Sequence, residues 1–165
     1  MTLLLLLACG PSPGAVVDGL ASENPIEREA MARDAASIDD PRVIEALIGA
    51  LEDRSVDVRR HAVESLGALR APDAIPSLCD LVERDPAVGV QRAAITALAR
   101  IGDARAVPVL VRHLEAHRDA PPLDVIWALG EIGDPSAVAI LSELRRSGDV
   151  YVSYNASKAL ARIRS

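Results

Sequence analysis

The tetrapeptide Leu66-Gly67-Ala68-Leu69 decides the fold, because altered copies of it recur along the chain. Each copy has a small second residue and an aliphatic fourth residue, and the other four begin at Ala35, Leu98, Leu129 and Leu160. Successive copies are spaced 31, 32, 31 and 31 residues apart. A fixed period of this length is typical of stacked repeat proteins, in which each unit buries its apolar face only against its neighbours.

Around these copies, apolar residues recur every three or four positions, as on one face of an amphipathic helix. Pro follows Asn24, Asp40, Asp85 and Asp134, which is a helix start signal, and Gly102, Gly133 and Gly148 stand where helices are expected to stop. The pattern predicts helices at about 25–37, 41–52, 56–69, 73–84, 88–101, 105–117, 122–132, 136–146 and 151–164, with a short turn near Val16–Leu20. We therefore expect an all-α protein of about four to five helix pairs.

Two stretches carry a resemblance to a known family. The segment from Val58 to Leu69 resembles the second helix of a HEAT-like repeat, and the segment from Ala97 to Leu110 resembles the turn into the next pair. The likeness is to the short variant of phycobilisome lyases and extends over about residues 24–165. It implies an armadillo/HEAT-type α-α superhelix. Because such repeats occur in lyases, hydroxylases, kinase partners and scaffolds, the fold leaves the function open.

The first residues have a different character. Leu6-Leu7-Ala8-Cys9 resembles the lipobox of bacterial lipoproteins, although no Lys or Arg precedes the leucines. The resemblance implies a signal segment over 1–9, a lipid on Cys9 and a flexible linker over 10–23. Localisation is then the bacterial cell envelope, with the lipid as the membrane contact. The alternative is a cytoplasmic protein with an inert Cys9.

Composition and motifs exclude several classes of function. The net charge of −6 argues against nucleic-acid binding. His113 and His117 flank Glu115 and lack the His-Glu-x-x-His order of zinc proteases, and the chain has no His-Glu pair like those of HEAT-repeat hydroxylases. Cys79 aligns with Val111 and Ser142, which indicates a packing role. We expect no catalytic residue, no metal and no cofactor.

The resemblance implies that the second helix of each pair lines the concave face. The positions opposite its apolar stripe, together with their preceding neighbours, form a predicted partner-binding ridge. It consists of Arg60, His61, Glu64, Arg92, Thr96, Arg100, Asp124, Trp127, Glu131, Tyr154 and Lys158. Trp127 is the only tryptophan and has the character of an interface hot spot, unless it packs over Thr96 and Ala128. The acidic members interrupt the arginines, which argues against a continuous phosphate-binding track.

Three functions remain open. The favoured one is a non-catalytic, envelope-anchored scaffold that binds a protein partner on its concave face. The second is a phycobilisome-lyase-like subunit or lyase chaperone, disfavoured by the lipobox and by an aromatic content of only 2%. The third is a HEAT-like DNA-repair enzyme, disfavoured by the net charge.

The lipoprotein interpretation predicts a specific mass. In protein isolated from its native host, the mature chain should begin at a lipidated Cys9 and lack residues 1–8. Mass spectrometry that finds Met1 or an unmodified Cys9 would contradict the interpretation.

Overall fold

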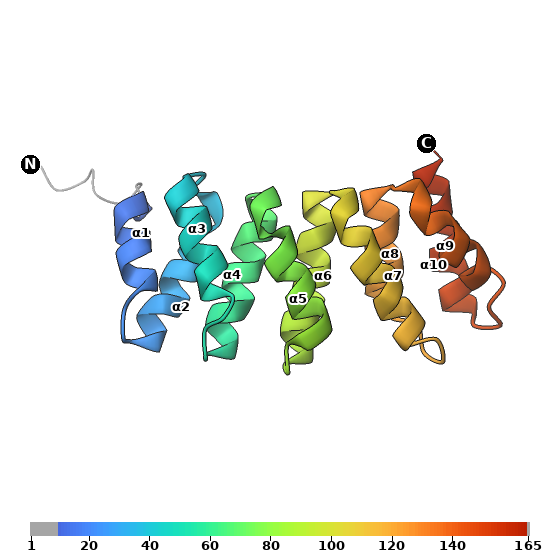
Figure 1. Cartoon of the computed structure of the whole chain (residues 1–165), viewed down its shortest axis with the longest axis horizontal. Coiled ribbons are helices and arrows are strands. Elements are labelled where there is room, and N and C mark those ends of the chain that lie inside the picture. The colour runs from blue at the N-terminus through green and yellow to red at the C-terminus, as the bar shows by residue number, and fades with distance from the viewer. Residues whose placement is uncertain (1–9, 165) are drawn as a thin grey trace, which may run out of the picture.

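The computed structural model describes residues 10–164, and these fold entirely into helices and connecting turns, with no strand in that range. The α-helices of this part are α1 (Pro13–Leu20), α2 (Pro25–Asp34), α3 (Pro41–Ala50), α4 (Val56–Ala68), α5 (Ile75–Arg84), α6 (Val88–Ile101), α7 (Val107–Ala116), α8 (Leu123–Ile132), α9 (Val138–Leu144) and α10 (Val150–Ile163). They form five antiparallel pairs that stack side by side from one end of the molecule to the other (Figure 1). The all-α superhelix expected from the repeat is confirmed.

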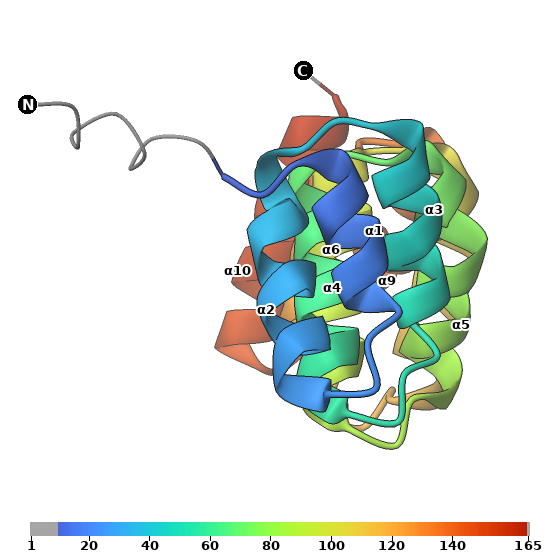
Figure 2. The same cartoon turned by 90° about the vertical axis from the view of Figure 1, so that its left-hand side faces the viewer.

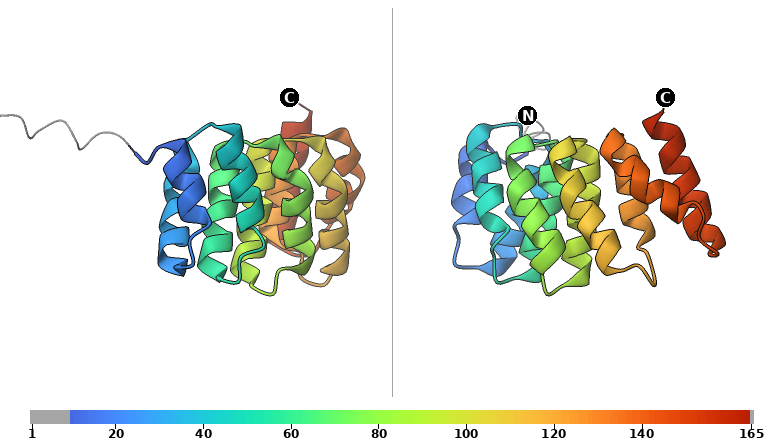
Figure 3. Two further views of the ribbon diagram at one scale, coloured as in Figure 1. Left: turned by 60° about the vertical axis from the view of Figure 1, so that its left-hand side comes forward. Right: turned by 45° about the vertical axis from the view of Figure 1, so that its right-hand side comes forward.

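The pairs make two layers. Viewed along the stack, α1, α3 and α5 lie on one side and α2 and α10 on the other (Figure 2). The second helices of consecutive pairs pack on one another along the whole stack, whereas successive first helices contact each other much less. Two further views show the same regular order of pairs (Figure 3). The layer of second helices is therefore the tighter, inner layer.

The predicted apolar stripes form the core. Leu47, Leu78, Leu110 and Leu141 of the first helices are fully buried, and Leu66, Leu98 and Leu129 of the second helices face them from the other layer. Because every pair contributes the same positions, the core is one continuous ribbon between the layers.

Helix ends follow the local signals, with small shifts. Asn24, Asp40 and Asp149 cap α2, α3 and α10 through their side-chain oxygens, and Gly102 and Gly133 adopt a left-handed backbone with φ of 74° after α6 and α8. The helices expected at 73–84 and 105–117 begin as short 3₁₀ turns. The α-helix proper starts at Ile75 and at Val107, and Pro76 and Pro108 stand second in these helices, where a missing amide hydrogen is tolerated.

The N-terminal expectation needs a correction. Residues 10–23 were expected to be a flexible linker, yet residues 13–20 form α1, which packs on α2 and α3. The hydroxyl oxygen of Ser12 accepts a hydrogen bond from the Ala15 amide at 3.2 Å, Pro13 suits the first helical turn, and Val16 is fully buried. The signal segment predicted over 1–9, including Cys9, lies outside the described residues and stays a prediction.

Glycine sets the spacing of two layers of the stack. A Cβ atom built on Gly67 of α4 would lie 2.8 Å from the Ala97 Cβ of α6, and one on Gly130 of α8 would lie 2.8 Å from the Ala159 Cβ of α10. Real carbon atoms do not approach this closely, so α4 and α6, and α8 and α10, are in backbone contact that only glycine allows. At the equivalent position α6 carries Ala99, and α6 packs on α8 less extensively.

Two buried arginines tie successive loops together. Arg28 of α2 donates to both carboxylate oxygens of Asp53, at 2.6 and 3.1 Å, and to the carbonyl oxygens of Ser22 and Glu23. One repeat later, Arg59 of α4 donates to both carboxylate oxygens of Asp85, at 2.7 and 3.0 Å, and to the Asp53 carbonyl oxygen. We call these pairs, Arg28–Asp53 and Arg59–Asp85, the Arg–Asp clips.

The clips form a ladder along the edge where the loops within each pair lie. Both arginines are more than nine-tenths buried. The backbone carbonyl oxygen of each aspartate accepts a hydrogen bond from the side chain at the arginine position of the next repeat. After Asp85 that side chain is Gln91, which donates to the Asp85 carbonyl oxygen at 2.8 Å. At the third pair the neutral Gln91 therefore takes the place of the arginine, and the series of buried ion pairs ends.

The glycine contact predicts a substitution effect. Gly67→Ala should lower the free energy of unfolding by about 1–3 kcal/mol, because its methyl group must push α4 and α6 apart. Gly49→Ala in α3, where nothing lies within 4 Å, should instead be neutral or stabilise by up to about 1 kcal/mol. Urea unfolding compares the two variants, and equal effects would mean that the close approach is unimportant.

The clips predict a pH dependence. Burial opposes ionisation of Asp85, but hydrogen bonds from Arg59 and from the Ala87 amide outweigh it and hold the pKa of Asp85 below its usual 3.8. A carboxyl group of this kind stabilises the fold above its unfolded pKa, and the stabilisation disappears as pH falls through the lower folded pKa. Asp85→Asn should therefore cost about 3–5 kcal/mol at neutral pH, because it leaves Arg59 buried without a charged partner.

Denaturation at neutral pH and at about pH 2.5 measures this effect. The wild-type chain should lose more stability on acidification than Asp85→Asn does, and the exposed Asp39→Asn should behave like wild type at both pH values. Parallel losses in wild type and Asp85→Asn would show that the clip contributes nothing to the acid response.

Candidate ligand and partner surfaces

The structure places the predicted ridge on the inner layer. Its members lie on α4, α6, α8 and α10, one group of two or three on each helix. They occupy the same turns of successive helices, as the repeat predicts. Whether the ridge binds a partner is not tested by the fold, and that role stays a prediction.

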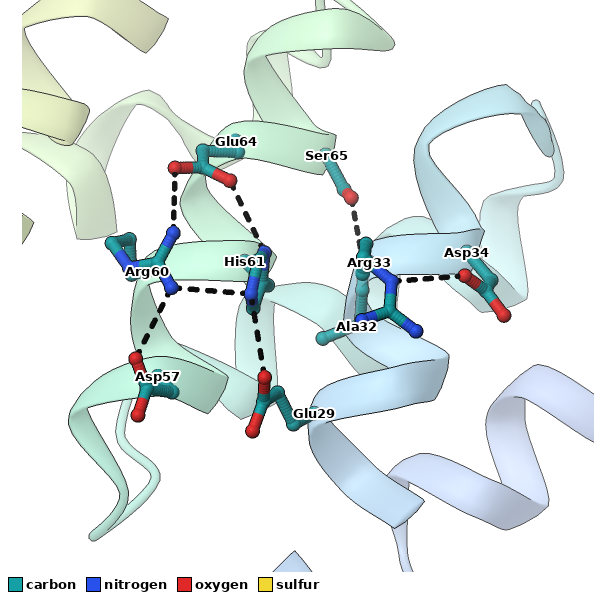
Figure 4. A network of polar contacts seen from close by, with 9 residues as sticks. All are labelled: Glu29, Ala32, Arg33, Asp34, Asp57, Arg60, His61, Glu64 and Ser65. Carbon is teal, nitrogen blue, oxygen red and sulfur yellow. Dashed lines mark hydrogen bonds and ion pairs between the residues drawn. The ribbon is translucent and has the colours of Figure 1, made fainter. Parts of the chain in front are cut away.

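On α4 the ridge is a network of polar contacts (Figure 4). Arg60 lies between Asp57 and Glu64, at 3.1 and 3.2 Å, and His61 binds Glu64 at 3.2 Å. His61 also reaches Glu29 of α2, with 3.6 Å between Nε2 and Oε1. The network therefore bridges two repeats and leaves Arg60 held by two carboxylates.

The next helices continue the pairing across repeats. Arg92 of α6 binds Asp124 of α8, with 3.0 Å between Nε and Oδ2, and Arg162 of α10 forms an ion pair with Glu131 of α8. Exposed ion pairs of this kind contribute little stability, about 0–1 kcal/mol each. Because each of these arginines lies beside a carboxylate, the positive charges of this surface do not form a continuous basic track.

The aromatic ridge residues lie at the C-terminal end. Trp127 is 36% exposed and Tyr154 is 60% exposed, and the Lys158 ammonium group lies 5.4 Å from the centre of the Tyr154 ring. Nearly two-thirds of the Trp127 surface is therefore covered, so it combines packing with an open face. Both interpretations of Trp127 drawn from the sequence, the interface hot spot and the packing residue, stay predictions.

The fourth pair departs from the repeat where α8 begins. Pro121 and Pro122 align with Val90 and Gln91 of α6, the first turn of that helix. A proline pair cannot supply the amide hydrogens or the packing of this turn, so α8 starts at Leu123 and has 10 residues where α6 and α10 have 14. No Arg–Asp clip can form here either, because Pro122 occupies the arginine position.

The missing turn leaves a cavity of about 460 Å³ between α6, α7 and α8. It is lined by Val88, Gln91, Arg92, Ile95, His113, His117, Ala120, Pro122, Leu123 and Asp124, and we call it the α6–α8 junction. Its volume lies within the range of small-molecule sites. The Pro-Pro dipeptide, out of register with the other repeats, was the sequence signal that could have predicted it.

The two histidines of the junction stack on each other. Their ring centres are 4.4 Å apart, and Nδ1 of His117 is hydrogen-bonded to the His113 carbonyl oxygen at 2.8 Å. Burial, and then the neighbouring His117, lower the pKa of His113. Its ring is therefore neutral at pH 7 and offers one donor and one acceptor.

The other candidates for chemistry are the Cys79 thiol and possible metal ligands. Burial, together with Asp80 and Glu83, raises the pKa of the Cys79 thiol to about 11, so the thiol is protonated at neutral pH. Within residues 10–164, no three His, Cys, Asp or Glu side chains gather into a possible metal site. Over the same residues no helix has the length and apolar character needed to cross a membrane.

Stacked antiparallel helix pairs with a tight inner layer define an α-solenoid repeat protein. The family model of HEAT repeats matches residues 15–89 and 71–123, and the model of the PBS lyase HEAT-like repeat matches residues 123–146. The chain belongs to the HEAT-repeat family. The resemblance inferred from the sequence is confirmed.

Three curated relatives are similar in sequence. Bilin biosynthesis protein PecE of Mastigocladus laminosus is 39% identical over 75 residues, which cover 46% of this chain and 28% of the relative, and PecE of a Nostoc strain is 37% identical over 75 residues, covering 46% and 30%. Phycocyanobilin lyase subunit alpha of a Picosynechococcus strain is 31% identical over 142 residues, covering 74% of this chain and 53% of the relative. The chain thus spans at most about half the length of these relatives.

Solved structures share the fold. A chain of the complex of CpcE and CpcF of phycocyanin lyase from Nostoc matches with a TM-score of 0.79 and 23% identity, covering 99% of this chain and 69% of that one. An engineered protein matches with a TM-score of 0.64 and 22% identity, covering 93% and 79%. At these identities the likeness concerns the fold alone.

The sequence relatives correct the function favoured above. We expected a non-catalytic, envelope-anchored scaffold and placed a lyase-like subunit second. All three relatives are named for bilin biosynthesis or as a phycocyanobilin lyase subunit, which overturns that order. The lipobox-like motif and the scarcity of aromatic residues were given too much weight, since neither tests what the repeat surface binds.

Proposed function

We propose that the chain is a HEAT-repeat subunit of a bilin lyase or of a lyase chaperone, which holds an open-chain tetrapyrrole while it is attached to a carrier protein. The observation that carries the proposal is the similarity to a phycocyanobilin lyase subunit over 74% of the chain. In this proposal the chain is one subunit rather than a complete enzyme.

The structure is suited to holding and orienting. Glycine contacts hold α4 against α6 and α8 against α10, and the buried clips fix the loops beside α2 and α4, so much of the inner layer is ordered before a partner arrives. Pre-ordered side chains lose little entropy on binding. The protonated Cys79 thiol is a poor nucleophile, which favours a role in positioning over one in covalent chemistry.

The proposal includes a protein partner. The relative in the phycocyanin lyase structure is solved as a complex of two chains, and by analogy of fold we expect this chain to bind a second subunit or the carrier protein. The ridge is the surface we assign to that contact. Trp127, partly exposed near the middle of α8, would be its central apolar residue.

Co-expression tests the function directly. The full chain is produced with a phycocyanobilin source and the α subunit of phycocyanin, with and without the Nostoc CpcF subunit, and covalent bilin on the carrier is read from fluorescence on a denaturing gel. We expect attachment to increase severalfold when the chain is present.

Trp127→Ala should reduce that increase, because truncation of a central aromatic residue commonly weakens an interface by about 2 kcal/mol or more. Ile26→Ala removes a side chain that is 74% exposed at the opposite end of the stack and should change nothing. Attachment that is the same with and without the chain, with no complex formed, would rule the function out.

A further inference from the structure

We propose that the α6–α8 junction is the tetrapyrrole site of this chain, with Arg92 binding a propionate carboxylate and Val88, Pro122 and Leu123 contacting the ring system. This inference rests on the proposed function and assigns it a location. It follows from three features that meet at this junction.

The first feature is the interruption of the stack. The α6–α8 contact lacks the glycine that brings α4 against α6, lacks an Arg–Asp clip, and lacks the first turn of α8. The α4–α6 junction, one repeat earlier, has all three of these contacts. The cavity of about 460 Å³ left at the α6–α8 junction has room for a ligand of appreciable size.

The second feature is the apolar rim. Val88 is 65% exposed and Leu123 is 39% exposed, and both line the cavity together with Ile95 and Pro122. Trp127 lies one turn beyond Leu123 on the same face of α8. A flat conjugated molecule can therefore bury its faces on this rim and reach an aromatic partner at the edge.

The third feature is the arrangement of polar groups. Arg92 donates through Nε to Asp124, and within residues 10–164 its terminal Nη1 and Nη2 groups have no partner. Asp124 offsets part of its charge and fixes the orientation of its guanidinium group. The outer edge of that group can bind a carboxylate with two parallel hydrogen bonds. The neutral His113 ring, set deeper, suits the lactam oxygen or pyrrole N–H of a bilin.

The previous repeat provides an internal comparison. Arg60 occupies the position of Arg92 and Val56 that of Val88, but Arg60 is held by both Asp57 and Glu64, and α4 retains its first turn. Residues of the same kind are therefore present one repeat away without this cavity. They serve as matched controls.

The test is a titration of the full chain with free phycocyanobilin. Binding is measured as quenching of Trp127 fluorescence and as a change in the absorbance of the bilin. We expect saturable binding of one bilin per chain. Arg92→Gln should weaken it about tenfold, the loss expected for a charge-assisted carboxylate contact, and Arg60→Gln should leave it unchanged. Both side chains lie at the surface, and circular dichroism verifies that the variants fold.

A second pair of variants examines the rim. Val88→Glu places a carboxylate where the ring system is expected and should weaken binding at least about tenfold, whereas Val56→Glu should not. The dimethyl ester of phycocyanobilin should bind wild type about as weakly as the free acid binds Arg92→Gln. These patterns together support both the carboxylate contact and the apolar contact.

Several results would overturn the assignment. Equal effects of the α4 and α6 variants, or none from either, would place the bilin elsewhere, and absence of free bilin binding would remove the site. Laurate that competes as well as the bilin would make the junction a general site for amphipathic carboxylates. The attachment assay is read separately: attachment without bilin binding retains the function and rejects the site, and binding without attachment rejects the function alone.

Discussion

The approach of one second helix to the next is the constraint on which the rest of the molecule depends. Gly67 and Gly130 allow α4 and α8 to touch the backbones of α6 and α10, and the alanines opposite them leave no room for anything larger. Because the inner helices lie this close while the outer ones remain farther apart, the solenoid has a defined inner surface. The ridge residues are regularly spaced because the second helices that carry them are regularly spaced.

The clips act on a different part of the stack. Arg28 and Arg59 fix the loops within pairs, which contain few apolar residues and would otherwise be held only by the ends of their helices. A buried pair gains little net stability, because desolvation of both charges offsets their attraction. Its effect is geometric: each arginine has five donors in a fixed plane, so it sets the distance from one loop to the next.

Much of the fold could be predicted because each repeat of a solenoid has the same pattern of core, helix-start and helix-stop residues. Leu66, Leu98 and Leu129 occupy the core that their spacing predicts, and the left-handed turns at Gly102 and Gly133 occur where helix stops were expected. Helix α1 was misjudged as linker because Pro13 and Gly14 are common in both structures, and only the burial of Val16 distinguishes them.

Polar contacts between repeats were harder to foresee. Arg28 and Arg59 share a repeat position, as do Asp53 and Asp85, but spacing alone does not reveal that the side chains meet across a loop. The ridge positions on the inner layer followed from the helix pattern, whereas the α6–α8 junction did not. The cavity is present because Pro121 and Pro122 do not continue α8 by one more turn. Whether a missing turn leaves a cavity depends on how the neighbouring repeats pack around it.

Because the stack is built of successive repeats, its two ends can respond differently to denaturant. In a solenoid, cooperativity passes only between adjacent repeats, so the N-terminal and C-terminal repeats can unfold at different free energies. The segment from α1 to α6 contains both clips, and the segment from α7 to α10 contains the single tryptophan, Trp127. Intrinsic tryptophan fluorescence therefore monitors the C-terminal segment, whereas unfolding of the N-terminal segment has to be followed by another signal, such as circular dichroism.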